Sequence, residues 1–245
     1  MTGNLDLARM GTVYYLQTKQ QYPEIEALVE MESSQKAAVF FTRTHAGIRT
    51  LGDLRGKRVA FGDATSSVTF WGQAKLADEG MTGSDLAEYT FLNSRSEFIE
   101  EAHELGVAAA LKRKRWLHST ADVIEGVVSG RFDAGVTTEN GYSKHQHRGL
   151  VRIPGSEFLR RPSPWVARGN LPADLARDLV AVFTEIRNIE FLLLLPDRPS
   201  GFSPITEATH AQEREAMDRI ERLFPISSPP LNEPFKPTPK KVPTQ

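Results

Sequence analysis

Three consecutive hydroxyl side chains, Thr65, Ser66 and Ser67, follow a short apolar run and precede a predicted helix. The N-terminus of a helix presents unpaired backbone N–H groups and a partial positive charge, so it can hold an anion without lysine or arginine. Hydroxyl donors suit a tetrahedral oxyanion such as phosphate or phosphonate, which offers several acceptor atoms. In the simpler alternative, one hydroxyl caps the helix and the others are loop residues. The residues alone leave both readings open.

Other kinds of chemistry find less support in the sequence. The phosphate-binding pattern GxxxxGK[ST] is absent. Ser66, His118 and Asp133 are the residue types of a hydrolytic triad, but no G-x-S-x-G elbow surrounds the serine. His145 and His147 have a spacing that a strand can use for metal binding, yet no third ligand is evident. We therefore expect no enzyme activity, no metal and no cofactor.

Composition narrows the choice of partners. The chain has 245 residues, no cysteine and a formal net charge of -1. A nearly neutral protein offers no strong attraction to nucleic acid or to an anionic membrane. The longest aliphatic run, Phe191 to Leu195, is far shorter than the roughly 20 residues that span a bilayer. The first residues lack the pattern of a secretory signal. The expected ligand is a small molecule that is recognised locally.

Strands and helices alternate between residues 36 and 137. The predicted strands are Lys36–Thr42, Lys57–Phe61, Tyr89–Leu92 and Phe132–Thr137, and the predicted helices are Ser67–Glu79 and His118–Gly130. This order indicates an α/β protein with a mainly parallel sheet that helices cover on both faces. Ligands of such sheets usually lie beyond the carboxyl ends of the strands. Residues 65–67 and 118–120 would both lie there.

The rest of the chain gives fewer signals. We expect strands at Leu150–Ile153 and Trp165–Ala167, followed by one helix from Pro172 to about Leu194 and another over Glu207–Leu223. Seven of the 21 residues from 225 to 245 are proline. This tail is predicted to be disordered or extended.

Four segments together resemble the periplasmic substrate-binding proteins of phosphate, phosphite and phosphonate ABC transporters, which have the type II binding-protein fold. They are GNLDLARMGTVYYL at Gly3–Leu16, GIRTLGDLRGKRVAFGDATSS at Gly47–Ser67, LHSTADVIEGVVSGRFDAGVTTEN at Leu117–Asn140 and GFSPITEATHAQEREAMDRI at Gly201–Ile220. The resemblance covers residues 3 to about 224.

The resemblance implies two lobes with flanking helices and a ligand cleft between them. Lobe 1 would comprise residues 1–50 and 150–224, and lobe 2 residues 51–149, with crossings near Ala46–Thr50 and Leu150–Pro164. The family has a strand and a helix ahead of the first matching segment, so lobe 1 is expected to be incomplete. Residues 225–245 would form a tail outside both lobes.

The resemblance also implies the ligand-binding residues. They are Thr65, Ser66 and Ser67 in the hydroxyl loop, Tyr14 or Tyr15 from the opposite lobe, His118 at a helix start, and Glu139, which matches a position that faces the ammonium group in amine-bearing phosphonate binders. Adjacent tyrosines are more often one buried and one exposed, and an acid at a strand end is often only solvated.

The function implied is the substrate-binding component of an ABC transporter, periplasmic, with a small oxyanion as ligand and a membrane permease as partner. Two alternatives remain. A ligand-sensing domain of a regulatory protein would keep the same pocket, and an enzyme built on this fold is the less favoured reading.

Overall fold

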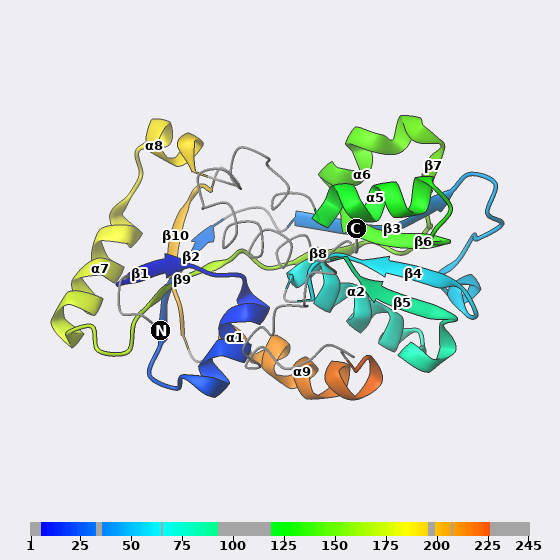
Figure 1. The fold of residues 1–245 in the computed structure, drawn as a ribbon. Helices are drawn as coiled ribbons and strands as arrows, with labels where there is room; N and C mark the ends of the chain where they lie inside the picture. The colour runs from blue at the N-terminus through cyan, green and yellow to red at the C-terminus, as the bar shows by residue number, and fades with distance from the viewer. Residues whose placement is uncertain are drawn as a thin grey trace, which may run out of the picture.

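Two separate β-sheets lie side by side in the structure, a computed structural model (Figure 1). It describes residues 6–32, 36–64, 66–92, 119–195, 199–206 and 208–225. The predicted tail beyond residue 225 lies outside these ranges. The mixed α/β class expected from the sequence is confirmed.

The first sheet has four strands, all antiparallel to their neighbours. In spatial order they are β1 (Leu7–Arg9), β9 (Pro164–Ala167), β2 (Glu26–Glu32) and β10 (Gly201–Pro204). Its buried side chains include Val29, Met31 and Phe202. Fully burying side chains of this size contributes about 1.5–3 kcal/mol each.

The second sheet has the order β5 (Glu88–Phe91), β4 (Arg58–Phe61), β6 (Ala134–Thr138), β3 (Lys36–Arg43) and β7 (Leu150–Arg152), with β8 (Phe158–Arg160) pairing with the start of β3. Strand β4 is parallel to β5 and β6, whereas β3 is antiparallel to β6, β7 and β8. The predicted parallel pairing is therefore confined to β5, β4 and β6. Strand β3 differs because it enters this sheet from β2 of the other one.

Helices cover both faces of the second sheet. They are α2 (Ser67–Asp78) on one face and α5 (Ser119–Val128) and α6 (Glu139–His145) on the other, with short 3-10 turns at Leu51–Leu54, Gly83–Asp85 and Gln146–Arg148. Phe40 packs with Phe61 and Leu76 on the α2 side, whereas Val39 and Phe41 face α5 and α6. An apolar run without alternation, as in β3, is what a strand buried on both faces requires.

The remaining helices lie around the first sheet and between the two sheets. They are α1 (Thr12–Gln21), α7 (Ala173–Glu185), α8 (Ile189–Leu194) and α9 (Ala211–Leu223). In Figure 1, α7 and α8 lie on the outer side of the first sheet, and α1 and α9 lie below the space between the sheets. No helix of the described residues is both long and apolar enough to cross a bilayer.

The single helix predicted from Pro172 to Leu194 is wrong. Two helices are found, because Ile186 adopts an extended conformation with ψ 112° and ends α7. Asn188 then starts α8, and its side chain accepts a hydrogen bond of 3.0 Å from the backbone N–H of Phe191. Asparagine is a favoured N-cap residue, so this break has a local cause. The last helix also begins later than expected, at Ala211.

The sheet to which β3 belongs differs from the division expected on sequence. The expected division places residues 36–43 in lobe 1, yet β3 pairs with β6 from Ala38–Thr138 to Thr42–Ala134. The chain therefore passes between the sheets after β2 and returns between β8 and β9, at residues 161–163. Near Ala46 and Thr50, both flanking strands belong to the second sheet.

Candidate functional site

Three helices begin at one edge of the second sheet. Strands β4 and β6 are parallel neighbours, so their carboxyl ends lie at the same edge, and α2 and α6 follow these ends. The first turn of α5 meets them there, because Thr137 Oγ1 lies 3.4 Å from Thr120 Oγ1. Helix N-termini carry partial positive charge, so this edge is suited to an anion.

Helix α2 supplies the first part of the candidate site. Ser66 is its N-cap residue, and the Ser66 hydroxyl accepts a hydrogen bond of 3.1 Å from the backbone N–H of Thr69. The same hydroxyl donates to Thr69 Oγ1 at 3.2 Å. The structure thus assigns the capping role to Ser66. A hydroxyl can both donate and accept, but its geometry here is set by the cap.

Ser67 differs from Ser66 because it is the first residue of the helix and is half-buried. The first turn of a helix leaves its backbone N–H groups without partners inside the helix, and in α2 these include Ser67 and Val68. Ser67 and these N–H groups are the donors that remain for an oxyanion at this position. Thr65 lies outside the described residues.

Helix α6 starts directly after β6 and places Glu139 at the same edge. Thr138 is the N-cap residue and accepts a 3.0 Å hydrogen bond from the backbone N–H of Gly141. Glu139 is paired: Arg152 Nη2 lies 2.5 Å from Glu139 Oε1, and Ser143 donates to the same oxygen at 3.2 Å. The acidic side chain expected to face an ammonium group is therefore already engaged by a guanidinium.

Gly141 packs the starts of α5 and α6 together. A methyl group added at this glycine would lie 2.7 Å from Thr120 Cγ2 and 2.7 Å from Thr137 Oγ1. Such distances are too short for real contacts, so only glycine lets the two helix starts approach this closely. His118, the residue before α5, lies outside the described residues.

The two candidate tyrosines have different surroundings on α1. Tyr15 is 6% exposed, packs with Val13 and Ile25, and its hydroxyl accepts a long 3.4 Å hydrogen bond from the backbone N–H of Ala27. Tyr14 is half-buried and lies outside this core cluster. The structure therefore assigns Tyr15 to the apolar cluster between α1 and α2, which leaves Tyr14 as the better candidate for a ligand contact.

Helices α1 and α2 bring the two sheets into contact beside the site. Val13 and Leu16 of α1 share an apolar cluster with Phe70 and Ala74 of α2. A cavity of about 20 Å³ lies there, lined by Val13, Gln17, Ala64, Phe70, Gln73, Met217, Ile220, Glu221 and Phe224. It has room for a water molecule but not for a phosphonate.

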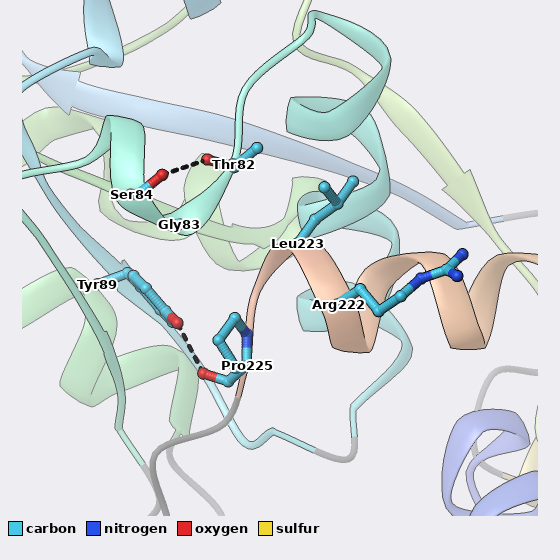
Figure 2. A pocket seen from close by; sticks show the side chains of 7 residues that line it. All are labelled: Thr82, Gly83, Ser84, Tyr89, Arg222, Leu223 and Pro225. Carbon is cyan, nitrogen blue, oxygen red and sulfur yellow. Dashed lines mark hydrogen bonds between the residues drawn. The ribbon is translucent and has the colours of Figure 1, made fainter.

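A larger depression lies at the far end of α9, away from the candidate residues. Its volume is about 470 Å³, and its lining is Thr82, Gly83, Ser84, Tyr89, Arg222, Leu223 and Pro225 (Figure 2). Its polar groups are largely paired with one another: Tyr89 donates to the Pro225 carbonyl at 2.6 Å, and the hydroxyls of Thr82 and Ser84 lie 2.8 Å apart. This depression is formed where the end of α9 packs against the second sheet, and it shares no residue with the predicted site.

Asp133 supports the opposite edge of the second sheet. Its carboxylate accepts hydrogen bonds from the backbone N–H of Arg58 at 2.9 Å and from Arg58 Nη2 at 3.0 Å. The hydrogen bonds from the Arg58 side chain are the main cause that lowers the pKa of Asp133. Burial acts in the opposite direction, and the backbone hydrogen bond and the charges of Arg58 and Arg43 lower the pKa further. These contacts are structural, because they hold the residue before β6 against the start of β4.

The two closely spaced histidines do not form a metal site with neighbours in the described residues. The rings of His145 and His147 are stacked, with centroids 6.5 Å apart. No group of three His, Cys, Asp or Glu side chains in the described ranges is arranged to hold a metal ion.

Sequence reasoning missed a buried cluster of ionisable side chains. It comprises Glu30, Arg161, His210 and Glu213, of which His210 and Glu213 are 1% and 0% exposed. Burial is the main cause that lowers the pKa of His210 to about 4 and raises the pKa of Glu30 and Glu213. The signal in the sequence that could have indicated this cluster is the position of Glu213, which lies on the same face of α9 as the apolar residues Met217 and Ile220.

The comparison with protein families defines the class. The family described as the periplasmic substrate-binding protein of the phosphonate ABC transporter matches residues 1–210. The chain belongs to this family, and the resemblance seen in the sequence is confirmed.

Solved structures agree on the fold. A binding protein component of an ABC phosphonate transporter from Pseudomonas aeruginosa superposes with a TM-score of 0.62 at 14% identity, over 90% of this chain and 70% of that one. PhnD1 from Prochlorococcus marinus, in complex with methylphosphonate, gives 0.61 at 16% identity over 90% and 80%. The periplasmic aliphatic sulphonate binding protein SsuA from Escherichia coli gives 0.62 at 17% identity over 91% and 77%. The fold is thus that of type II periplasmic binding proteins, and the matching family is one of ABC-transporter binding proteins.

Proposed function

We propose that this protein is the substrate-binding component of an ABC transporter and binds a small oxyanion of the phosphonate, phosphite or phosphate type. The observation that carries the proposal is the meeting of three helix N-termini at the carboxyl edge of β4 and β6, in a chain of this family. The expected partners are the ligand and a membrane permease, and the expected location is the periplasm.

The proposed cleft lies between two lobes, each built on one sheet. We place the division where the chain changes sheets, after β2 and before β9, so that residues 36–43 join lobe 2. Lobe 2 contributes Ser67, the backbone N–H groups of α2 and the starts of α5 and α6. Tyr14 of α1 is the proposed contact from lobe 1. Thr65 and His118 remain proposed contacts on the basis of the family resemblance.

The structure allows the capping role and the binding role to be separated by mutation. Ser66→Ala removes the cap and is expected to lower the free energy of unfolding by about 1 kcal/mol. Ser67→Ala leaves the cap in place and is expected to weaken oxyanion binding by about 1.5–3 kcal/mol, which corresponds to roughly ten- to a hundredfold. Asn188→Ala removes the cap of α8 and is the matched control, because it should lower stability without changing affinity.

Isothermal titration calorimetry with phosphate, phosphite, methylphosphonate, 2-aminoethylphosphonate and methanesulfonate tests the proposal. Methanesulfonate is included because sulfonate is also a tetrahedral oxyanion. Binding of at least one phosphorus oxyanion by the parent, with loss in Ser67→Ala, supports the assignment. A parent protein that binds none of the five ligands, or a Ser67→Ala variant that binds as well as the parent, contradicts it.

A further inference from the structure

Helix α9 reaches from one sheet to the other. At its start, His210 and Glu213 are buried beside Glu30 of β2, which belongs to the first sheet. Just after its end, Phe224 is 1% exposed and belongs to the same apolar core as Phe40 of the second sheet. Figure 1 shows α9 below α1 and α2, extending toward the second sheet. Residues 210–225, with an anchor at each end, are called the strap below.

The first anchor is ionic and includes the chain crossing. Arg161 lies in the segment that leads from β8 in the second sheet to β9 in the first. Its Nε lies 3.1 Å from Glu213 Oε1, and its Nη1 lies 3.7 Å from Glu30 Oε1. One guanidinium on the crossing therefore joins β2 to the start of the strap. Removing one partner would leave the other charge buried without compensation.

The second anchor is apolar with one strong hydrogen bond. The Tyr89 ring meets the Phe224 ring edge to face, with centroids 6.0 Å apart and an angle of 82° between the ring planes. The Tyr89 hydroxyl donates to the carbonyl of Pro225 at 2.6 Å, as Figure 2 shows. An exposed ion pair between Arg219 and Asp78 of α2 adds to this end at 2.5 Å.

The middle of the strap fills the space between the two helices that carry the candidate site. Met217 and Ile220 pack in one cluster with Val13 of α1 and Phe70 of α2. Tyr14 is the neighbour of Val13, and Ser67 is one turn ahead of Phe70. A change in how the strap packs between α1 and α2 would therefore change the distance between the two sides of the proposed cleft.

We propose that the strap sets the separation of the two sheets and thereby regulates the opening of the oxyanion cleft. Two chain crossings alone leave the sheets free to rotate about the line that joins them. A third link that is anchored on both sheets resists this rotation. Phe224, Tyr89, Glu213 and Arg161 are positioning residues that act through the strap. The effect on ligand binding rests on the proposed function, whereas the effect on sheet separation does not.

The absence of cysteine permits a direct distance measurement. Spin labels on Asp178→Cys in α7 and Lys144→Cys in α6, both exposed, report the separation of the two sheets by pulsed electron paramagnetic resonance. The parent should give a narrow distribution of distances. Phe224→Ala and Glu213→Gln should each broaden it and move it to longer distances, and Tyr89→Phe should do so to a smaller extent. Glu215→Gln, an exposed position on the same helix, is the control and should match the parent.

Folding of each variant is checked by circular dichroism. If Phe224→Ala does not fold, Glu213→Gln and Tyr89→Phe carry the test, because both keep the shape of the side chain. Folded Glu213→Gln and Tyr89→Phe variants with the parent distribution would overturn the proposal. Unfolding of all three anchor variants, with Glu215→Gln unaffected, would overturn it as well, since the strap would then be part of the folding core and not a regulator.

Methylphosphonate serves as the probe for the coupling to the cleft. Loosening either anchor should raise its dissociation rate about tenfold in stopped-flow measurements. A distance change without any change in this rate would overturn the regulatory part of the proposal. A parent protein that binds no oxyanion contradicts the proposed function but leaves the measured effect of the strap on sheet separation intact.

Discussion

The carboxylate of Glu139 is held by Arg152, with 2.5 Å between Glu139 Oε1 and Arg152 Nη2. The same guanidinium lies 3.7 Å from Glu157 Oε1 and stacks over the Tyr142 ring at 5.2 Å from its centroid. The acidic side chain at the start of α6 is therefore neutralised within the protein. This relationship bears directly on which ligands the proposed cleft selects.

Replacing Arg152 with methionine should improve the binding of amine-bearing ligands. Freed from its partner, Glu139 can pair with an ammonium group. A partly exposed ion pair contributes up to about 1 kcal/mol. The affinity for 2-aminoethylphosphonate relative to methylphosphonate should then rise by up to about fivefold, measured by calorimetry. Glu157→Gln is the control and should leave this ratio unchanged. An unchanged ratio in Arg152→Met would exclude Glu139 from the ligand end of the cleft.

His210 should make a contribution that lowers the stability of the protein between pH 7 and pH 5. Burial and the charges of Arg161 and Arg214 lower the pKa of this histidine from 6.5 to about 4. Below pH 6.5 the unfolded chain takes up a proton that the folded protein does not, so stability is lost as the pH falls toward 4. At pH 5 the loss is about 2 kcal/mol, from about 1.4 kcal/mol for each pH unit.

Chemical denaturation of the parent and of His210→Gln at pH 7 and pH 5 checks this. The loss attributable to His210 should vanish in the variant. The charged groups around His210 are Glu30, Arg161, Glu213 and Arg214. The two carboxyl groups act in the opposite sense, since their raised pKa contributes stability that is lost as the pH rises through the folded-state value. An equal loss in the parent and in His210→Gln would rule out the histidine as its source.

Asp133→Asn should destabilise the protein without affecting the ligand. The substitution weakens the hydrogen bonds to Arg58 and should cost about 1 kcal/mol. The lowered pKa means that the stabilisation by Asp133 is present above pH 3.8 and is lost as the pH falls through the folded-state value. Urea denaturation at pH 7 measures the cost, and a tenfold change in oxyanion affinity would show that this edge of the sheet communicates with the cleft.

Gly141→Ala should separate the starts of α5 and α6. Its new methyl group would lie 2.7 Å from two threonine side chains, and overpacking of this kind costs about 1–3 kcal/mol. Oxyanion affinity should fall because both helix N-termini move. Gly52→Ala is the control, since its methyl group would lie 3.6 Å from Thr50 Oγ1, an ordinary contact. Normal stability and affinity in Gly141→Ala would show that the two helix starts are not tightly coupled.

Local signals in the sequence predicted most of the second sheet. The helix at Ser67–Asp78 and the strand at Arg58–Phe61 lie within one residue of the expected bounds, because apolar periodicity and a glycine stop define them. The sequence located the hydroxyl loop at residues 65–67 but did not show which of its residues caps the helix. Choosing Ser66 as the cap required its distance to the Thr69 N–H, which sequence cannot supply.

Long-range pairing was beyond the sequence. The antiparallel match of Ala38 with Thr138 joins residues 100 positions apart, and an apolar strand carries no mark of its direction or of its sheet. The partner of Glu139 was also hidden, because Arg152 lies on the edge strand β7, which β3 separates from β6, and β3 comes from a distant part of the sequence. The family resemblance pointed to Glu139 but gave no indication that Arg152 neutralises it.

The outer helices α7 and α8 have a consequence for handling the protein in solution. Leu194 is 82% exposed, Ile189 71% and Val182 60%, so folding removes little of their surface from water. Polar substitutions here should leave the free energy of unfolding almost unchanged, within about 0.5 kcal/mol. These exposed side chains can associate with other apolar surfaces at high concentrations of sulfate, which strengthens apolar association. Leu194→Lys would therefore raise the ammonium sulfate concentration at which the protein precipitates and would shorten its retention on a hydrophobic-interaction column.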